Sequence, residues 1–231
     1  KIGIPGLIGG ISLGFAFTGF IYSITMTTAA VTLFMLAVMP FIAAIIGYIF
    51  LRESLRKLTL LAMIIAFIGV IIMIYNDSLG GSILGALLGF ASATGFAVYT
   101  VTIRWRPQTP KFTTVFLAGL FCAAFSFIML GASFNSFYII PSINIYLSLL
   151  HGLIVASGLI LFSLGGKYLP AAELALLSLM EVVGGIFWVW LPWFGINEVP
   201  SLTTIIGGVI ITFAVIIHGI GAKRKRMPVT S

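Results

Sequence analysis

Residues 37–74 read AVMPFIAAIIGYIFLRESLRKLTLLAMIIAFIGVIIMI, in which two long apolar runs flank one short charged segment. A helix needs about 20 apolar residues to cross a hydrocarbon core of roughly 30 Å. With the apolar residues that continue on either side, the two runs extend over 28–51 and 58–75 and approach that length. The segment RESLRK, residues 52–57, is too polar to lie within a bilayer. The stretch therefore predicts two transmembrane helices joined by a short basic turn.

The composition of the whole chain is that of a membrane protein. Of 231 residues, 61% are apolar and only 7% are charged, and the mean hydropathy is +1.24, whereas roughly 25% of residues in soluble domains are charged. The net charge of +7 does not indicate nucleic-acid binding, because no basic face interleaved with stacking aromatics is present. The single Cys122 offers neither a disulfide nor a thiolate metal site. We expect no metal and no bound cofactor.

Apolar runs and the breakers between them predict an all-α, polytopic bundle of eight transmembrane helices. The expected spans are residues 6–24, 28–51, 58–75, 82–103, 112–133, 144–166, 170–193 and 201–221. The connections between them are short and contain turn residues, so little chain remains for a soluble domain.

The positions of the basic residues orient these spans. All twelve fall on one side of the eight-span topology: Lys1, Arg52, Arg56, Lys57, Arg104, Arg106, Lys111, Lys167, Lys223, Arg224, Lys225 and Arg226. Cytoplasmic connections of membrane proteins are enriched in Lys and Arg. We therefore expect a multi-pass protein of the bacterial cytoplasmic (inner) membrane, with both ends of this chain and its basic tail, residues 222–231, in the cytoplasm.

The chain contains a repeat whose two copies cross the membrane in opposite senses. A shift of 142 residues lays Gly10 on Gly152, Phe20 on Phe162, and Ala29-Ala30 on Ala171-Ala172. A shift of 145 residues lays Glu53 on Glu198 and Ile65 on Ile210. Because one copy starts inside and the other outside, the repeat is inverted. Inverted repeats are common in secondary transporters, in which two mirrored halves open alternately to each side, and some channels share them.

Two stretches resemble the repeat of the EamA family, within the drug/metabolite transporter superfamily. In residues 37–74 the likeness consists of Pro40 within a helix, Glu53 at the end of that helix, and Gly69 late in the next. The stretch LLSLMEVVGGIFWVWLPWFGINEVPSLTTIIGGVIITFAVII, residues 176–217, resembles the second copy, with Glu181 in mid-helix and Glu198 before Pro200.

The resemblance implies ten helices in two five-helix repeats. Residues 1–75 would then be a partial first repeat of three helices and residues 82–221 the second repeat, with the first two helices of the family fold absent. It also implies a secondary transporter, with export as the expected direction and amino acids, amines or hydrophobic cations as expected cargo. The expected partners are a small-molecule substrate and the lipid bilayer, with proton coupling and a homodimer as further expectations.

Glu181 and His151 are the main candidates for substrate binding or proton coupling. Glu181 is expected about 16 Å along its helix, near the midplane, where an ionised carboxylate is costly unless it is paired or solvated. His151 is expected at a similar depth, so the two side chains could relay a proton. A protonated hydrogen bond between helices for Glu181 and a structural hydrogen bond for His151 remain the alternatives. The aromatic candidates for lining a cation cavity are Trp188, Tyr99 and Tyr22.

Other polar residues are expected to serve folding or gating. Pro40, Glu53 and Glu198 are candidates for that role. Glu173, three residues after Pro170, is expected to favour the positive end of its helix, and His218 is expected to face lipid headgroups. The glycines at 81, 85 and 89 have the small-xxx-small spacing that lets transmembrane helices pack closely.

An enzyme is the weaker interpretation. Gly10-Ile11-Ser12-Leu13-Gly14 matches the G-x-S-x-G pattern of hydrolases, but that motif needs a strand-turn-helix and here lies in an apolar helix. The alternatives to a transporter are an intramembrane, serine protease-like enzyme that uses Ser157, Ser12 or His218, and a non-transporting assembly subunit. Because the chain has no P-loop, a proton gradient or exchange would have to drive transport.

Overall fold

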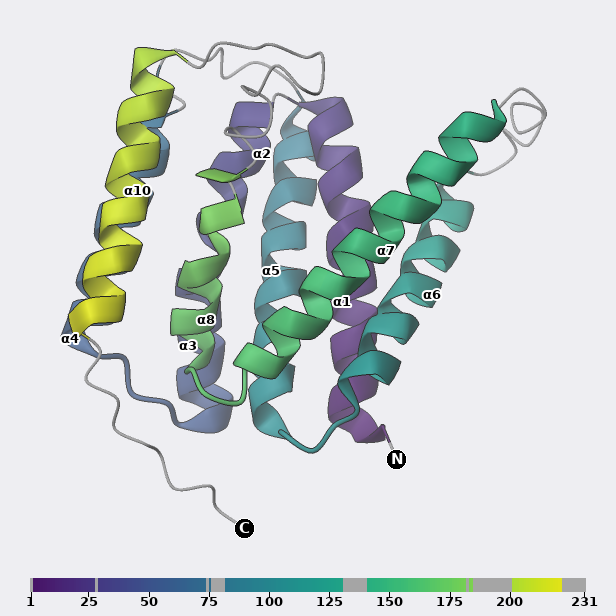
Figure 1. The fold of residues 1–231 in the computed structure, drawn as a ribbon, viewed down its shortest axis with the longest axis horizontal. Coiled ribbons are helices and arrows are strands. Elements are labelled where there is room, and N and C mark those ends of the chain that lie inside the picture. Colours follow the sequence, from purple (N-terminus) through teal and green to yellow (C-terminus); the bar gives the residue numbers. More distant parts are fainter. Residues whose placement is uncertain are drawn as a thin grey trace.

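The computed structural model describes residues 2–27, 29–73, 75, 82–130, 141–181, 183–184 and 201–221, and its regular elements are α-helices (Figure 1). In chain order they are α1 (Gly3–Met26), α2 (Ala29–Leu36), α3 (Met39–Leu51), α4 (Lys57–Met73), α5 (Ile83–Trp105), α6 (Lys111–Leu130), α7 (Ser142–Gly165), α8 (Ala171–Ser178) and α10 (Leu202–Gly221). The prediction of an all-α, polytopic helix bundle is confirmed.

Five stretches of the described chain are long and apolar enough to cross a membrane: Gly3–Met26, Val31–Leu51, Ile83–Trp105, Lys111–Ile128 and Ser142–Gly165. Helices α4 and α10 are also apolar, over the shorter stretches Lys57–Ile72 and Leu202–His218. Where an expected span is fully described, its ends agree with the helix ends to within three residues. Hydropathy located these spans well because each is bounded by charged or turn residues. The outer part of the expected span 170–193 lies outside the described residues.

The expected span 28–51 is broken into α2 and α3 just before Pro40. Proline has no N–H and cannot bond to the carbonyl four residues earlier, so the chain tightens there. The Val38 N–H donates to Met35 O at 3.2 Å, three residues back, and the four-residue pattern resumes when Ile42 N–H donates to Val38 O. The helix axis is thus interrupted where the sequence has its mid-helix proline.

Two pairs of helices from distant parts of the chain pack antiparallel, and in one of them, α4 with α10, the two helices are equivalent in the predicted repeat. Helix α4 begins at the end of the bundle where α10 finishes, and α3 finishes where α8 begins (Figure 1). One buried cluster joins α4, α8 and α10, and it includes Val70 together with its repeat equivalent Val215. Gly69 permits the close approach of α4 to α10, because a Cβ there would lie 3.0 Å from the Gly207 carbonyl oxygen. The antiparallel packing of α4 and α10 agrees with the predicted inverted repeat.

Helix α1 is enclosed by α5 and α6 through small residues. A Cβ added at Gly14 would lie 2.8 Å from two backbone atoms of α6, Ala118 O and Cys122 N. On α5, a Cβ at Gly85 would lie 3.0 Å from the Met26 backbone, and one at Gly89 would lie 2.8 Å from a side-chain oxygen of α1. The expected packing role of Gly85 and Gly89 is confirmed, whereas Gly81 lies outside the described residues.

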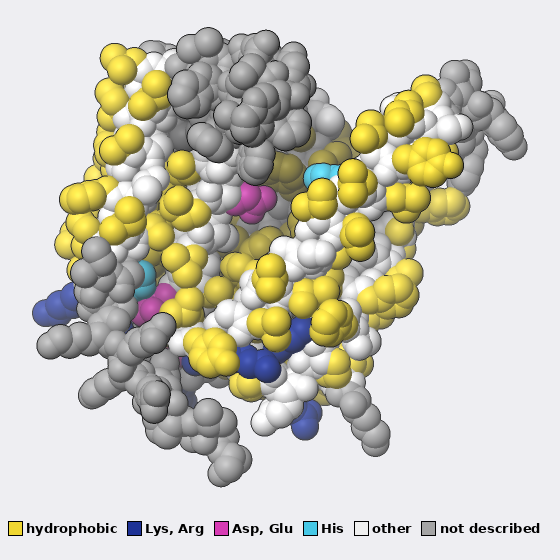
Figure 2. Space-filling view, viewed as in Figure 1, with side chains coloured by type: hydrophobic (Ala, Val, Ile, Leu, Met, Phe, Trp, Pro, Cys, Tyr) yellow, Lys and Arg dark blue, Asp and Glu magenta, His cyan; other side chains and the backbone are white. Residues whose placement is uncertain are grey.

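All the Lys and Arg side chains of the described residues lie at one end of the bundle. They follow α3, begin α4, end α5, begin α6 and follow α7: Arg52, Arg56, Lys57, Arg104, Arg106, Lys111 and Lys167. Figure 2 shows the dark blue side chains on the lower part of the molecule, at the end where α4 and α6 begin. We call this end the basic end. The basic connections between helices, which the sequence predicts to share one side, thus lie together at one end of the described structure.

Helix α7 is the least covered helix of the bundle. Only 6% of its apolar 18-residue stretch is buried. The helix crosses the others obliquely (Figure 1). Its second half packs against α1, α5 and α6 through Leu159 and Phe162. Residues 142–154, its first half, are exposed throughout.

We expect Gly14→Ala to destabilise the protein, because the added methyl group overlaps backbone atoms of α6 that cannot rotate away. Overpacking of this kind costs about 1–3 kcal/mol. The matched control is Gly119→Ala on α6, where an added Cβ meets nothing within 4 Å and the better helix propensity of alanine adds up to about 1 kcal/mol. Thermal unfolding in detergent measures both. Equal melting temperatures for the two variants would contradict this close contact.

Candidate functional site

Glu53 forms the centre of a polar junction at the basic end. Its Oε1 accepts a hydrogen bond from Arg104 Nε at 2.9 Å, and its Oε2 accepts one from the Ala171 N–H at 2.9 Å. Arg104 Nη1 donates in addition to the carbonyls of Gly166 and Lys167, at 3.3 and 3.2 Å. One carboxylate therefore connects the end of α3 with the end of α5 and with the turn between α7 and α8.

The same contact caps α8. The first N–H groups of a helix have no partner within the helix, and Pro170 in front of α8 offers no side-chain cap. The Glu53 carboxylate accepts from the first of these N–H groups and brings a negative charge to the positive end of the helix dipole. Glu173 lies in the first turn of α8, as expected, but the carboxylate that accepts from the Ala171 N–H comes from a residue 118 positions earlier in the chain.

Glu173 lies buried in a second polar cluster, which joins α4, α8 and α10. Its Oε2 is 3.5 Å from His218 Nε2, and its Oε1 is 4.0 Å from Arg56 Nε. The Thr59 hydroxyl donates to the same Oε1 at 3.4 Å. Glu173 is only 4% exposed, so these three partners compensate a carboxylate that has little access to bulk water.

The expectation that His218 faces lipid headgroups is wrong. Its side chain is 4% exposed and points toward Glu173. A signal for this was present in the sequence, because Ile211, Ala214 and Val215 precede His218 at the spacing of one helix face, and all four are buried. The histidine continues the packed stripe of α10.

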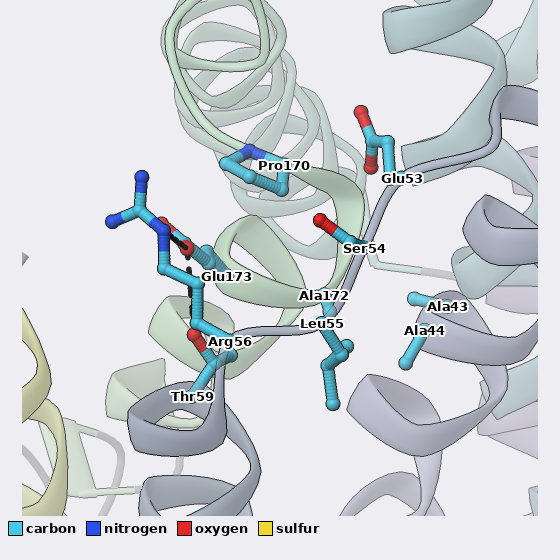
Figure 3. A pocket seen from close by; sticks show the side chains of 10 residues that line it. All are labelled: Ala43, Ala44, Glu53, Ser54, Leu55, Arg56, Thr59, Pro170, Ala172 and Glu173. Carbon is cyan, nitrogen blue, oxygen red and sulfur yellow. Dashed lines mark hydrogen bonds and ion pairs between the residues drawn. The ribbon is translucent and has the colours of Figure 1, made fainter. Parts of the chain in front are cut away.

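A small cavity of about 10 Å³ lies between the two polar clusters, which is about the space of one water molecule. Figure 3 shows Arg56 and Thr59 converging on Glu173, with Glu53 on the other side of the pocket. Residues of α3, α4 and α8 and of the turn after α3 line it. At the basic end, paired charges and a small cavity thus join α3, α4, α5, α8 and α10.

The midplane candidates Glu181 and His151 do not contact each other in this conformation. Both side chains are exposed, and no ion pair within 4.0 Å joins them among the described residues. Figure 2 shows the molecule hollowed between the α8 side and α7, with an acidic and a histidine side chain beside the hollow. Their roles in binding or coupling stay predictions.

The other candidates have different surroundings. Tyr99 is fully buried, its hydroxyl is hydrogen-bonded to Ser163, and its ring stacks on Phe162. This placement favours packing between α5 and α7, and contact with a solute would require the helices to move. Tyr22 is half-buried. Trp188 and Glu198 lie outside the described residues.

The serines considered for an enzyme are engaged by their own helices. The Ser12 hydroxyl donates to Gly9 O at 3.1 Å, and the Ser157 hydroxyl donates to Leu153 O at 2.8 Å. Neither serine forms a hydrogen bond with a histidine in the described part of the chain. No three His, Cys, Asp or Glu side chains of the described residues are grouped closely enough to hold a metal ion.

Comparison with known proteins agrees with the resemblance seen in the sequence. Residues 1–75 match the EamA-like transporter family. This segment holds α1 to α4, with the break at Pro40 and the carboxylate of Glu53. This part of the chain is thus similar to a transporter family, and the apolar helices of the described residues indicate an integral, multi-pass membrane protein.

The fold of almost the whole chain is similar to that of a solved structure. A solved structure described as "Crystal structure of protein" superposes with a TM-score of 0.66 at 15% identity, over 94% of this chain and 89% of that one. At this identity the likeness concerns the fold alone. No curated protein matches the sequence.

We expect Glu53 and Arg104 to be strongly coupled in stability. Their side chains are only 17% and 15% exposed, so removal of either leaves the other partly buried and unpaired. A double-mutant cycle with Glu53→Gln and Arg104→Gln should give a coupling energy of about 1–3 kcal/mol. Arg52→Gln is the matched control, because Arg52 is exposed and belongs to no ion pair of the described residues. A coupling as small as that between Glu53 and Arg52 would show that the contact contributes nothing.

Proposed function

We propose that the protein is a secondary transporter that exports small amine-bearing metabolites, amino acids or hydrophobic cations across the cytoplasmic membrane by alternating access. The antiparallel packing of repeat-equivalent helices carries this proposal, because two inverted halves can exchange conformations around a central site. The match of residues 1–75 to the EamA-like transporter family supports the same assignment. The basic end would face the cytoplasm, in accordance with the excess of Lys and Arg there.

The polar junction around Glu53 supports the idea of a gate at the basic end. Glu53 comes from the first copy of the repeat, whereas its partners Arg104 and Ala171 come from the second. Movement of one half relative to the other would separate these groups. Opening toward this end therefore requires that the Glu53 contacts break, and closing restores them.

Glu181 is the proposed binding or coupling group. It lies just beyond α8, about 16 Å from the basic end of that helix, and its carboxylate is exposed, with no ion-pair partner in the described residues. A carboxylate at this depth can bind either an ammonium group or a proton. Competition between cation and proton at one carboxylate would couple export of the substrate to entry of a proton.

We expect Glu181→Gln to abolish substrate-dependent proton movement in proteoliposomes. Glutamine keeps the size of the side chain but neither ionises nor binds a proton. Glu181→Asp is the matched control and should retain part of the transport, because the charge remains. The measurement is counterflow of a labelled amine together with a pH-sensitive dye inside the vesicles. Unchanged transport and pH dependence in Glu181→Gln would exclude the carboxylate mechanism.

The uncovered half of α7 is proposed to pack against two further helices. Helix α1, from the first copy, is enclosed by α5 and α6, which come from the second. Helix α7 is the repeat equivalent of α1, so by the same symmetry a pair of helices from the first copy would pack against its exposed residues 142–154. Residues 1–75 would then be the last three helices of a five-helix repeat, and residues 82–221 the complete second one.

Spin labels distinguish helices from lipid as the neighbours of α7. If two helices cover α7, a label at Leu150 should be poorly accessible to oxygen dissolved in the bilayer. A label at Phe116, on the exposed side of α6, should be readily accessible and serves as the control. Both labels are measured in the protein expressed from its native gene, purified, and reconstituted into nanodiscs. Equal accessibility at the two positions would show that lipid covers α7.

A further inference from the structure

A buried, uncompensated lysine lies at the basic end, away from the two carboxylate clusters. Lys111 is only 7% exposed, and its Nζ has no hydrogen-bond partner among the described residues. A buried ammonium group costs several kcal/mol unless an opposite charge or strong acceptors compensate it. The side chain is therefore placed to bind a further group.

The neighbouring hydroxyl of Thr109 is in the same situation. Thr109 is 7% exposed, and its Oγ1 is also buried without a partner in the described part of the chain. Both residues line one small cavity, together with Thr102, Thr114 and Ser163. The hydroxyls of these three are already hydrogen-bonded to Tyr99 O, Pro110 O and the Tyr99 hydroxyl. Lys111 Nζ and Thr109 Oγ1 are thus the uncommitted donors of the cavity.

The charges around this cavity favour an anion. Lys167 is close enough to act electrostatically on Lys111, and Arg106 Nη1 lies beside Gly3 at the start of α1. The two carboxylates at this end, Glu53 and Glu173, are paired with Arg104 and with His218 and Arg56. No carboxylate of the described residues offsets the Lys111 charge.

The helices add to the positive potential. Helix α6 begins at Lys111 and α1 begins at Gly3, so two helix N-termini meet at this cavity. Such termini favour anions through their dipoles and unpaired N–H groups. The cavity has a volume of about 10 Å³, which accommodates one oxygen atom of an anion, with the remainder at the mouth.

We propose that Lys111 and Thr109 bind a phosphate group at the basic end of the bundle. Lysine, a hydroxyl and helix N-termini together are a common set of phosphate ligands. The phosphate belongs either to a soluble ligand or to a lipid headgroup, since both reach this end of the protein. The site is separate from Glu181, and its occupancy can be measured without transport.

Thermal unfolding in phosphatidylcholine nanodiscs tests the site. Inorganic phosphate at 100 times its Kd should raise the melting temperature by about 5 °C or more, whereas chloride at equal ionic strength should not. Nanodiscs that contain phosphatidate form the second arm. A rise with inorganic phosphate assigns the site to a soluble ligand, and a rise with phosphatidate alone assigns it to a lipid headgroup.

The variants decide whether Lys111 and Thr109 are responsible. Lys111→Met should remove the phosphate-dependent rise and should unfold at a higher temperature than the unsubstituted protein when no anion is present, because an unpaired buried charge is gone. Lys57→Met, at an exposed lysine that begins α4 at the same end, should behave like the unsubstituted protein.

Thr109→Val should reduce the phosphate-dependent rise in melting temperature, and it decides the question if Lys111→Met does not fold. The proposal is overturned by an equal rise with chloride, by no rise in either arm, or by an undiminished rise in Lys111→Met or Thr109→Val.

Discussion

Hydrocarbon offers no hydrogen-bond partners, so every backbone group within the membrane has to be satisfied by its own helix or by a close neighbour. This constraint makes the chain a set of helices and gives each interruption a local cause. The break between α2 and α3 occurs where Pro40 cannot donate, and the adjacent N–H groups of Val38 and Phe41 bond three residues back instead. Small residues then let the intact helices approach, as Gly14 does on α1 and Gly69 on α4.

With so few charged residues, the position of each carboxylate has a large effect. Glu53 and Glu173 both lie at the basic end, and each joins segments that are far apart in the sequence. Glu53 links the end of α3 directly to Arg104 of α5 and to the N-terminus of α8, which the predicted repeat assigns to the other half of the chain. Ion pairs that cross between two mirrored halves hold one arrangement of those halves. They also form a discrete contact whose loss permits another arrangement.

The two ends of α7 show how unevenly the bundle is packed. Near the basic end, Phe162 and Ser163 pack against Tyr99 of α5, which fixes this part of the helix. Farther along, residues 142–154 have no such support. The corresponding helix of the first copy, α1, is buried against α5 and α6 through most of its glycines. The contrast arises because apolar helices gain little from lipid contact alone and become fixed only where small residues and hydrogen bonds connect them.

The sequence alone determined the membrane class, the helices and the gathering of basic residues at one end of the bundle, because these depend on local hydropathy and on the placement of Lys and Arg between spans. The resemblance at Pro40, Glu53 and Gly69 likewise indicated the family that matches residues 1–75. Only the tertiary structure decided which polar groups meet. Glu53 rather than Glu173 caps α8, and His218 is buried beside Glu173. Contacts between groups 45 or more residues apart, such as Glu173 with His218 or Glu53 with the Ala171 N–H, depend on how the helices rotate and pack. The periodicity of one helix does not specify which other helix packs against it.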